Sequence, residues 1–563
     1  MNKRNFLKSV AALGGSALLP SSLNPLAMYK TASAAVDYAG ATVDVTSVPA
    51  VMPQVINIFL YGGPSELSGN LTNIQEINDN SQNSYTAAFG DAILELENVP
   101  VGNLPNGFIT KNGFWRGTPN GNNPKIDNNG AGGRAMQFML DNGHMSVYRT
   151  LMKRLDGTRS HRESLLQSFK GSLDIEGSPG VGTRIAATLY QHSNQFVGNT
   201  RLADRDPGEE ITDIVNDLLL PFVSFEGDTR AYQQDPDFNI PLLYRGITLD
   251  QNFRNPYSRC AANTNCNPVS YDAELEALLL QNGVKISAEE YKNLRYSGSA
   301  NSFNLRAFLE NKISGIGAAN NSPLPFITDA NDIAEANLDP DNPGRLLYPN
   351  NRYRDRISAA VTLALVNPGS LYITVGGGLG GWDDHNNGID NYRNRMNDLF
   401  ETLKAAMLHI KYSDKSQDAA QTNAGSATGA LKTLDGRLRS TDNIVINVYG
   451  DFGRRVNLNG NQGWDHGNNQ NLFTFGGAGV RPGGMAALGK VVGKTVRVGD
   501  PGTNNQVTEP APGSYEAEPM SVASTVYSYF GVQNPEVLTR DDELNPAGVP
   551  AIDETQAGEP PLF

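Results

Sequence analysis

The sequence lacks the features of two large functional classes. No Lys/Arg-rich block lies beyond its first residues, and the net charge is -14 over 563 residues, so we expect no nucleic acid partner. No segment after the first residues is long and apolar enough to span a membrane. An anionic substrate therefore needs a local positive centre in an acidic protein, and a metal ion can supply one.

Cysteine is also scarce, with only Cys260 and Cys266 in the chain. Their close spacing predicts a small-loop disulfide if the protein matures in an oxidising compartment. A metal role for them is less favoured, because no histidine lies nearby in the sequence.

The first 34 residues have the pattern of an export signal. A basic stretch, Asn2–Lys8, precedes an apolar run over 10–19 and a small-residue cleavage site at Ala32–Ala34. The basic stretch resembles a twin-arginine signal with Lys3 in place of the first arginine, and a general secretory signal is the alternative. We expect a periplasmic or secreted protein, exported by the twin-arginine route.

The rest of the chain alternates between strand-like and helix-like segments, which predicts an α/β fold. The predicted strands are 55–61, 145–150, 371–375, 444–449 and 472–475. The predicted helices are 135–140, 162–170, 182–190, 352–365, 392–412 and 522–530. We expect a core in two parts, 50–194 and 346–545, an inserted region or cap over 195–345, and a loose tail over 546–563.

Two short motifs dominate the candidate chemistry. They are Gly381-Trp382-Asp383-Asp384-His385 and Gly463-Trp464-Asp465-His466. Each lies in a loop beside a predicted strand, and sites in open α/β sheets form at the carboxyl ends of strands. Carboxylate oxygens and imidazole nitrogens are ligands for divalent metals. We predict that Asp383, His385, Asp465 and His466 are ligands of one metal site.

Other candidates follow the remaining predicted strands. Ser65, after Gly62-Gly63, is placed as a nucleophile or as part of a plain turn. His161 is a metal ligand or belongs to a capped helix start. Asp451 is a further metal ligand, and Arg454 binds an anionic oxygen or forms a surface ion pair.

The ordered motifs resemble the bacterial family DUF1501. The resemblance rests on Gly62–Ser65, Ser160-His161, Gly380–His385, Tyr449–Arg454, Asn459–His466 and Phe475–Gly484. That family looks like a branch of the alkaline phosphatase and sulfatase superfamily. The resemblance implies a three-layer α/β/α sandwich with a mixed sheet and with one or two metals at the strand ends.

The chain departs from the family pattern at several positions. Glu66 and Ser68 replace a His and an Asp, Asp451 replaces a Glu, and Arg455-Val456 replaces Thr-Pro. No Cys/Ser-x-Pro-x-Arg segment exists, which excludes a formylglycine sulfatase.

From these features we expect an exported hydrolase that uses a divalent Zn, Mg, Mn or Ca ion. Its substrate is a small anionic ester or a polymer, with a phosphate or sulfate ester bond. The ion activates Ser65 or a water molecule, and Arg454 stabilises the transferred group. The alternative is a non-catalytic periplasmic binding or assembly protein that keeps the fold.

Overall fold

The computed structural model describes a core assembled from segments distant in sequence. These are residues 37–38, 41–45, 49, 51–66, 109–119, 127–128, 130–192, 221–225, 230–233, 246–249, 324–376, 381–413, 441–499, 506–541 and 544–561. The expected export signal and the Cys260–Cys266 disulfide lie outside the described residues.

The centre of the protein is a mixed sheet of eight strands in the order β14-β6-β13-β10-β3-β9-β7-β8. In that order the strands are Val491–Val492, Met145–Met152, Asn469–Gly476, Ile444–Gly450, Gln54–Leu60, Tyr372–Val375, Phe222–Ser224 and Ile247–Thr248. Strand β13 runs antiparallel to both of its neighbours, and the other neighbouring pairs are parallel. The five strands predicted from sequence are all present.

The central strands form because their sequences are apolar and rich in β-branched residues. Strand β3 reads QVINIFL and strand β10 reads IVINVYG, and every residue of both is buried. Strands buried on both faces read as continuous apolar runs rather than alternating ones.

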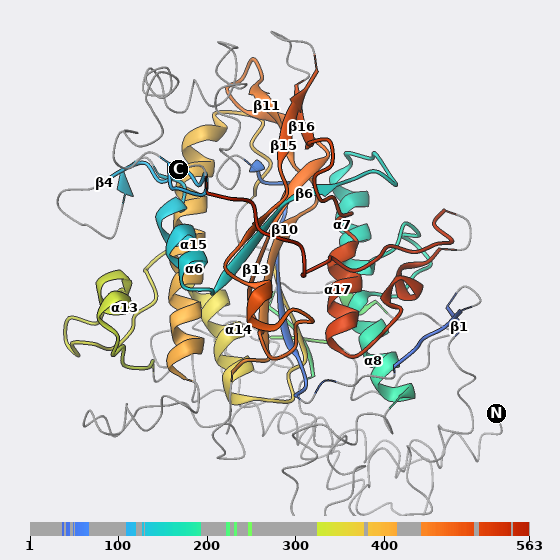
Figure 1. Cartoon of the computed structure of the whole chain (residues 1–563), viewed down its shortest axis with the longest axis horizontal. Coiled ribbons are helices and arrows are strands. Elements are labelled where there is room, and N and C mark those ends of the chain that lie inside the picture. The colour runs from blue at the N-terminus through green and yellow to red at the C-terminus, as the bar shows by residue number, and fades with distance from the viewer. Residues whose placement is uncertain are drawn as a thin grey trace, which may run out of the picture.

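Helices cover both faces of the sheet, so the core has three layers (Figure 1). Helices α6 (Gly133–Asp141), α14 (Arg354–Val366) and α15 (Gly388–Tyr412) pack on one face, where Ile56 and Ile58 of β3 point. The opposite face carries Val55 and Phe59 and is covered by α7 (His161–Lys170), α8 (Val181–Gln191) and α17 (Ser521–Tyr529). The expected α/β class with a mixed sheet is confirmed.

Smaller elements surround this core. Two antiparallel hairpins, β11–β12 (Arg454–Leu458 and Trp464–His466) and β15–β16 (Thr495–Val498 and Val507–Pro510), lie above one edge of the sheet (Figure 1). The remaining short elements are β1 (Asp37–Tyr38), β2 (Ala41–Thr42), β4 (Thr118–Pro119), β5 (Asp127–Asn128), η5 (Arg230–Tyr232), α13 (Ala330–Glu335), η8 (Gly484–Ala487) and η9 (Pro535–Thr539).

The sequence predicted that the region 195–345 is an insertion or cap, but part of this region belongs to the central sheet. Strand β7 lies within it and pairs with β9, and β8 extends the same edge. Both are short, three residues and two residues long, so they carry little periodic signal in the sequence.

The tail is packed rather than loose, so that prediction is wrong for the described residues 546–561. Val549, Ile552 and Glu554 are buried. The Glu554 carboxylate accepts hydrogen bonds from Arg481 and from the Tyr529 hydroxyl. A polar, proline-containing sequence without regular structure is held here by a buried ion pair, which has no local sequence signature.

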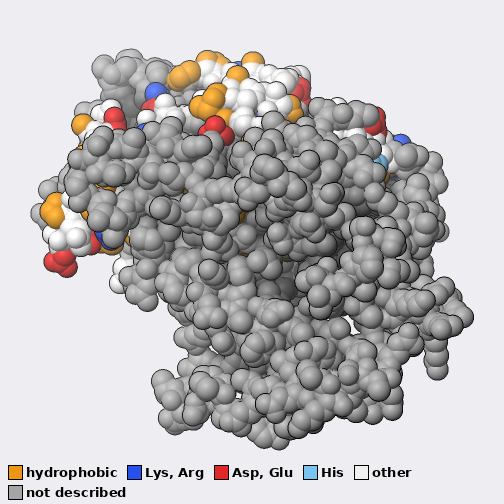
Figure 2. Space-filling view, turned by 90° about the horizontal axis from the view of Figure 1, so that it is seen from below, with side chains coloured by type: hydrophobic (Ala, Val, Ile, Leu, Met, Phe, Trp, Pro, Cys, Tyr) orange, Lys and Arg blue, Asp and Glu red, His pale blue; other side chains and the backbone are white. Residues whose placement is uncertain are grey.

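Within the described residues, no helix has both the length and the apolar character needed to cross a membrane. The face of the molecule in Figure 2 shows apolar, acidic and basic side chains of the described residues next to one another along its upper edge. No single type of side chain dominates that edge.

Candidate metal centre

The candidate site lies at the edge of the sheet where four parallel strands end. Strands β10, β3 and β9 are mutually parallel, and β6 has the same direction because both β6 and β10 are antiparallel to β13. Asp451 follows β10, Gly62-Gly63 follow β3, Asp383 follows β9, and His161 follows β6. The predicted location at the strand carboxyl ends is therefore confirmed.

His161 is the first residue of helix α7, and a cap fixes where that helix begins. The Ser160 side chain accepts a hydrogen bond from the Glu163 backbone N–H at 3.5 Å. The segment is thus both a capped helix start and a place for a functional histidine.

The two Trp-Asp motifs pack directly against each other. The Trp464 N–H donates to the Asp384 carbonyl at 2.8 Å, and the Gly388 N–H donates to the Gln462 carbonyl at 2.8 Å. Strand β12 pairs with β11, which sets His466 opposite Arg454. The separate motifs therefore form one double-loop structure over the sheet edge.

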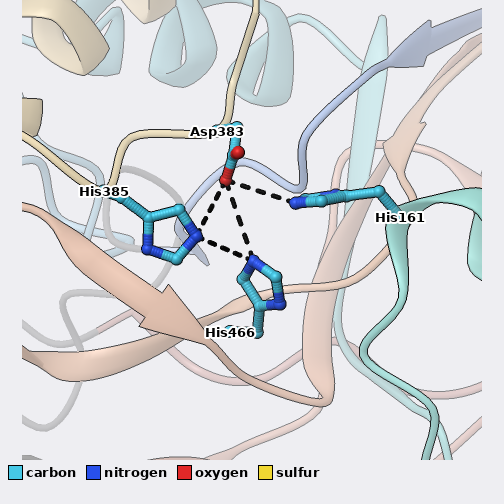
Figure 3. Close-up of side chains that lie close together, drawn as sticks. All are labelled: His161, Asp383, His385 and His466. Carbon is cyan, nitrogen blue, oxygen red and sulfur yellow. Dashed lines mark hydrogen bonds and ion pairs between the residues drawn. The ribbon is translucent and has the colours of Figure 1, made fainter.

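Three histidines converge on the carboxylate of Asp383 (Figure 3). The Asp383 Oδ1 atom lies 3.2 Å from His161 Nε2, 3.1 Å from His385 Nε2 and 3.7 Å from His466 Nε2. The Nε2 atoms of His385 and His466 are 2.9 Å apart. The predicted convergence of Asp383, His385 and His466 is confirmed, and His161 belongs to the same group.

The Nδ1 atom of each imidazole, on the side away from the cluster centre, contacts a neighbouring oxygen atom. The Nδ1 atom of His161 is 2.6 Å from Asp451 Oδ2, and that of His385 is 3.2 Å from Asp465 Oδ1. The Nδ1 atom of His466 lies 2.8 Å from the Arg159 carbonyl, which can only accept a hydrogen bond. Protons on the Nδ1 atoms leave the Nε2 lone pairs directed at the centre of the cluster.

The charges around the cluster shift its pKa values in different directions. The hydrogen bond to Asp451 raises the pKa of His161, whereas burial and then the charge of Arg454 lower that of His466 to about 4. Burial alone would raise the pKa of Asp383, but its hydrogen bond and charge interaction with Arg454 bring the pKa below its usual value. Asp383 is therefore a carboxylate and His466 a neutral imidazole near neutral pH.

This group of side chains fits a metal ion. Its four ligand atoms lie within 4.8 Å of one another. The two facing Nε2 atoms of His385 and His466 repel each other unless a proton or a cation lies between them. His161 Nε2 is buried and lies 3.2 Å from Asp383 Oδ1, and a cation bound between these two atoms would satisfy both of them. His161, Asp383, His385 and His466 could together hold a metal ion.

Asp451 and Asp465 do not belong to this ligand group, although the sequence predicted that they do. Each carboxylate contacts the Nδ1 side of a histidine and orients that ring. Carboxylates in this position are common partners of metal-binding histidines. Sequence position after a strand cannot tell a ligand from the residue that holds a ligand in place.

Arg454 also has a different role from the predicted one. Its side chain is fully buried, and its guanidinium donates to the carbonyls of Gly62, Gly63, Trp382 and Trp464. It also donates to Asp383 Oδ1 at 2.8 Å. Arg454 therefore connects Asp383 to the surrounding loops through buried hydrogen bonds.

Ser65 and Glu66 lie in the loop after β3 and are not part of the cluster. Ser65 is 9% exposed, and its carbonyl accepts a hydrogen bond from the Tyr392 hydroxyl at 2.6 Å. The buried Glu66 carboxyl accepts from Thr508 and from the Arg454 N–H. Burial raises the pKa of Glu66 to about 7. Glu66 therefore connects the loop after β3 to strands β11 and β16, and it does not belong to the group of four residues that could hold a metal.

Comparison with known proteins gives no further identification, since no family model, curated protein or solved structure matches this chain.

Proposed function

We propose that this protein is an exported metal-dependent hydrolase of the alkaline-phosphatase type that acts on a phosphate or sulfate ester. The observation that supports this most is the convergence of three imidazole Nε2 atoms and one carboxylate at an accessible sheet edge. The motifs that resemble DUF1501 contribute all four of these residues. Export is inferred from the leader sequence.

We propose zinc as the ion. Three imidazoles and one carboxylate are borderline-soft to hard ligands, which suit Zn²⁺, whereas Mg²⁺ and Ca²⁺ prefer oxygen ligands alone. Among the ions considered from sequence, Mn²⁺ is the next best fit.

Some residues of the site would bind the ion, and others would orient these ligands. His161, Asp383, His385 and His466 would hold the ion, which when bound supplies a Lewis acid for an ester oxygen. Arg454 holds Asp383, while Asp451 and Asp465 hold two of the rings. The Asp383 and His385 side chains are 47% and 34% exposed, so a substrate has access to the cluster.

One variant distinguishes Ser65 from a water molecule as the nucleophile. Ser65→Ala removes the side-chain oxygen that covalent catalysis requires. Loss of ester hydrolysis with unchanged metal content would identify Ser65 as the nucleophile. Retained hydrolysis would assign the attack to a water molecule, which the burial of Ser65 favours.

Metal analysis and an ester screen test the proposal. We expect about one zinc ion per chain and hydrolysis of phosphate or sulfate esters, both lost in His385→Ala. His192→Ala is the matched control, because His192 is outside the ligand group. A protein that binds the metal but hydrolyses nothing across a broad panel would favour the binding or assembly role.

A further inference from the structure

A small cavity lies next to Asp451, the carboxylate that contacts the Nδ1 side of His161. Its lining also includes Lys153, which directly follows strand β6, and Ser164 and Ser168 of helix α7. Its volume of about 10 Å³ has room for about one water molecule and leaves none for a substrate. The cavity is therefore suited to a structural water rather than to a larger ligand.

Asp451 uses only one of its carboxylate oxygens to contact the ring. The Oδ2 atom lies 2.6 Å from His161 Nδ1. The Oδ1 atom is buried and accepts no hydrogen bond from any residue that the structure describes. A buried carboxylate oxygen without a donor is costly. A donor in the cavity would therefore stabilise the carboxylate in the orientation that contacts His161.

Lys153 lines the cavity, but it does not supply that donor directly. It is 5% exposed, and its Nζ atom donates to the Thr158 carbonyl at 2.9 Å, to Ser164 Oγ at 2.7 Å and to Gln167 Oε1 at 3.1 Å. An ammonium group has three hydrogen atoms, and these contacts use all of them. Burial lowers the pKa of Lys153 to about 8, so the group stays mainly charged at neutral pH.

Ser164 can extend this hydrogen bond into the cavity. Its hydroxyl oxygen accepts from Lys153, which leaves the hydroxyl hydrogen to donate elsewhere. A water molecule that accepts from Ser164 can donate to Asp451 Oδ1, and Ser168 offers another hydroxyl one turn further along α7. Two or more polar partners in a polar cavity are what a buried water requires.

We propose that one bound water molecule connects Ser164 to Asp451, and that Lys153 acts through this chain as a positioning residue for His161. Lys153 donates to the Ser164 hydroxyl, the hydroxyl to the water, and the water to Asp451, so every donor meets an acceptor. The chain fixes the carboxylate, and the carboxylate fixes the ring. The effect on metal binding rests on the proposed metal site, whereas the water and the hydrogen bond of the ring do not.

A crystal structure of the purified protein tests the water directly. We expect one ordered water within hydrogen-bonding distance of both Ser164 Oγ and Asp451 Oδ1. NMR of the metal-free protein with isotopically labelled histidine tests the ring. The Nδ1 proton of His161, assigned by its loss in His161→Ala, should be protected from exchange with solvent. In Lys153→Met and in Ser164→Ala this signal should broaden or vanish, because the carboxylate is less firmly oriented.

Zinc affinity, measured by competition with a chelator, gives a further readout. Lys153→Met and Ser164→Ala should each weaken zinc binding by about tenfold, the lower end of the range for partners of metal-binding histidines. Because both residues act through one chain, the double variant should lose no more affinity than the more affected single variant. Ser164→Ala keeps the test available if Lys153→Met does not fold.

Lys170→Met and Ser172→Ala are the matched controls. Lys170 is a buried lysine at the far end of α7 that donates to the Glu176 carbonyl at 3.3 Å, and Ser172 is a buried serine just beyond that helix. Neither residue lines the cavity. Both variants remove the same chemical group elsewhere, so they should keep the imidazole signal and the zinc affinity of the parent.

The proposal is overturned if no water contacts both oxygen atoms, if both cavity variants keep the imidazole signal of the parent, or if the control variants lose it equally. Additive losses of zinc affinity in the double variant would also contradict the shared chain. Its failure is separable from failure of the hydrolase proposal. A protein that binds no zinc and hydrolyses no ester would contradict the hydrolase, while the water and the imidazole signal would still decide the role of Lys153.

Discussion

Each histidine of the cluster is fixed by a residue on its outer side, and these partners come from different parts of the chain. Asp451 holds His161, Asp465 holds His385, and the Arg159 carbonyl holds His466. A metal ion would bind the lone pair on each Nε2 atom. The partners on the Nδ1 side orient the rings so that these lone pairs face the centre of the cluster.

Asp465→Ala should therefore weaken metal affinity by about 10- to 100-fold without unfolding the protein. The His385 ring loses its hydrogen-bond acceptor and samples orientations in which Nε2 points elsewhere. Competition with a chelator of known affinity measures the change. Asp390→Ala is the control, because the Asp390 side chain is 77% exposed and pairs only with Arg393 among the contacts described. Equal affinities in the two variants would contradict the role of Asp465.

Glu66 should make stability fall as pH rises. Burial raises its pKa in the folded state from 4.5 to about 7. The unfolded chain loses the proton near pH 4.5, whereas the folded protein keeps it until about pH 7. The stabilisation is complete below pH 4.5 and is lost progressively up to pH 7. The loss is about 3 kcal/mol over this interval.

Denaturant unfolding of the parent and of Glu66→Gln across pH 4.5–7.5 measures this effect. The amide cannot ionise, so the free energy of unfolding of the parent should fall relative to the variant as pH rises. Parallel pH profiles would show that Glu66 ionises normally in the folded protein.

At the scale of elements, the site depends on the contact between the loop after β9 and the β11–β12 hairpin. Gly463 lies where the two meet, and a Cβ placed on it would be 2.2 Å from the His385 carbonyl carbon and 2.3 Å from the Asp384 carbonyl oxygen. No flexible side chain is available to move aside, since both neighbours are backbone atoms.

Gly463→Ala should force the two motifs apart. We expect a loss of about 1–3 kcal/mol in stability, typical of overpacking, together with strongly reduced metal binding. Gly460→Ala is the matched control. Gly460 lies in the same hairpin loop, and a Cβ added to it would have no neighbouring atom within 4 Å. Thermal unfolding and metal titration of both variants give the result. Similar behaviour of the two would contradict the close contact.

At the scale of the whole molecule, the C-terminal segment belongs to the folded core. Glu554 is 4% exposed and pairs with the buried Arg481, which also donates to Tyr529 and to Thr474 of β13. Through this pair, residues at the end of the chain are attached to the central sheet.

Glu554→Ala should destabilise the protein by about 3–5 kcal/mol, because Arg481 is then left as an uncompensated buried charge. Glu559→Ala removes the partly exposed pair with Lys494 and should cost less than about 1 kcal/mol. Chemical denaturation of both variants measures the difference. A loss below about 1 kcal/mol for Glu554→Ala would show that the segment is dispensable.

Local sequence patterns were sufficient for the main elements of the fold. The apolar, β-branched runs at 54–60 and 444–450 are buried strands, and the predicted helices 162–170 and 182–190 match α7 and α8 within one residue at each end. These elements were predictable because a buried strand or an amphipathic helix is encoded by neighbouring residues. Short edge strands such as β7 carry too few residues for such a pattern.

The sequence by itself determined which residues gather at the sheet edge, because motifs that follow parallel strands must meet there. Only the tertiary structure decided what each does: Asp383 faces the three rings, Asp451 and Asp465 lie behind two of them, and Arg454 is buried. The physical reason is that a ligand and its supporting partner have the same chemistry and similar sequence positions. They differ only in the direction of a side chain, which contacts between distant segments set.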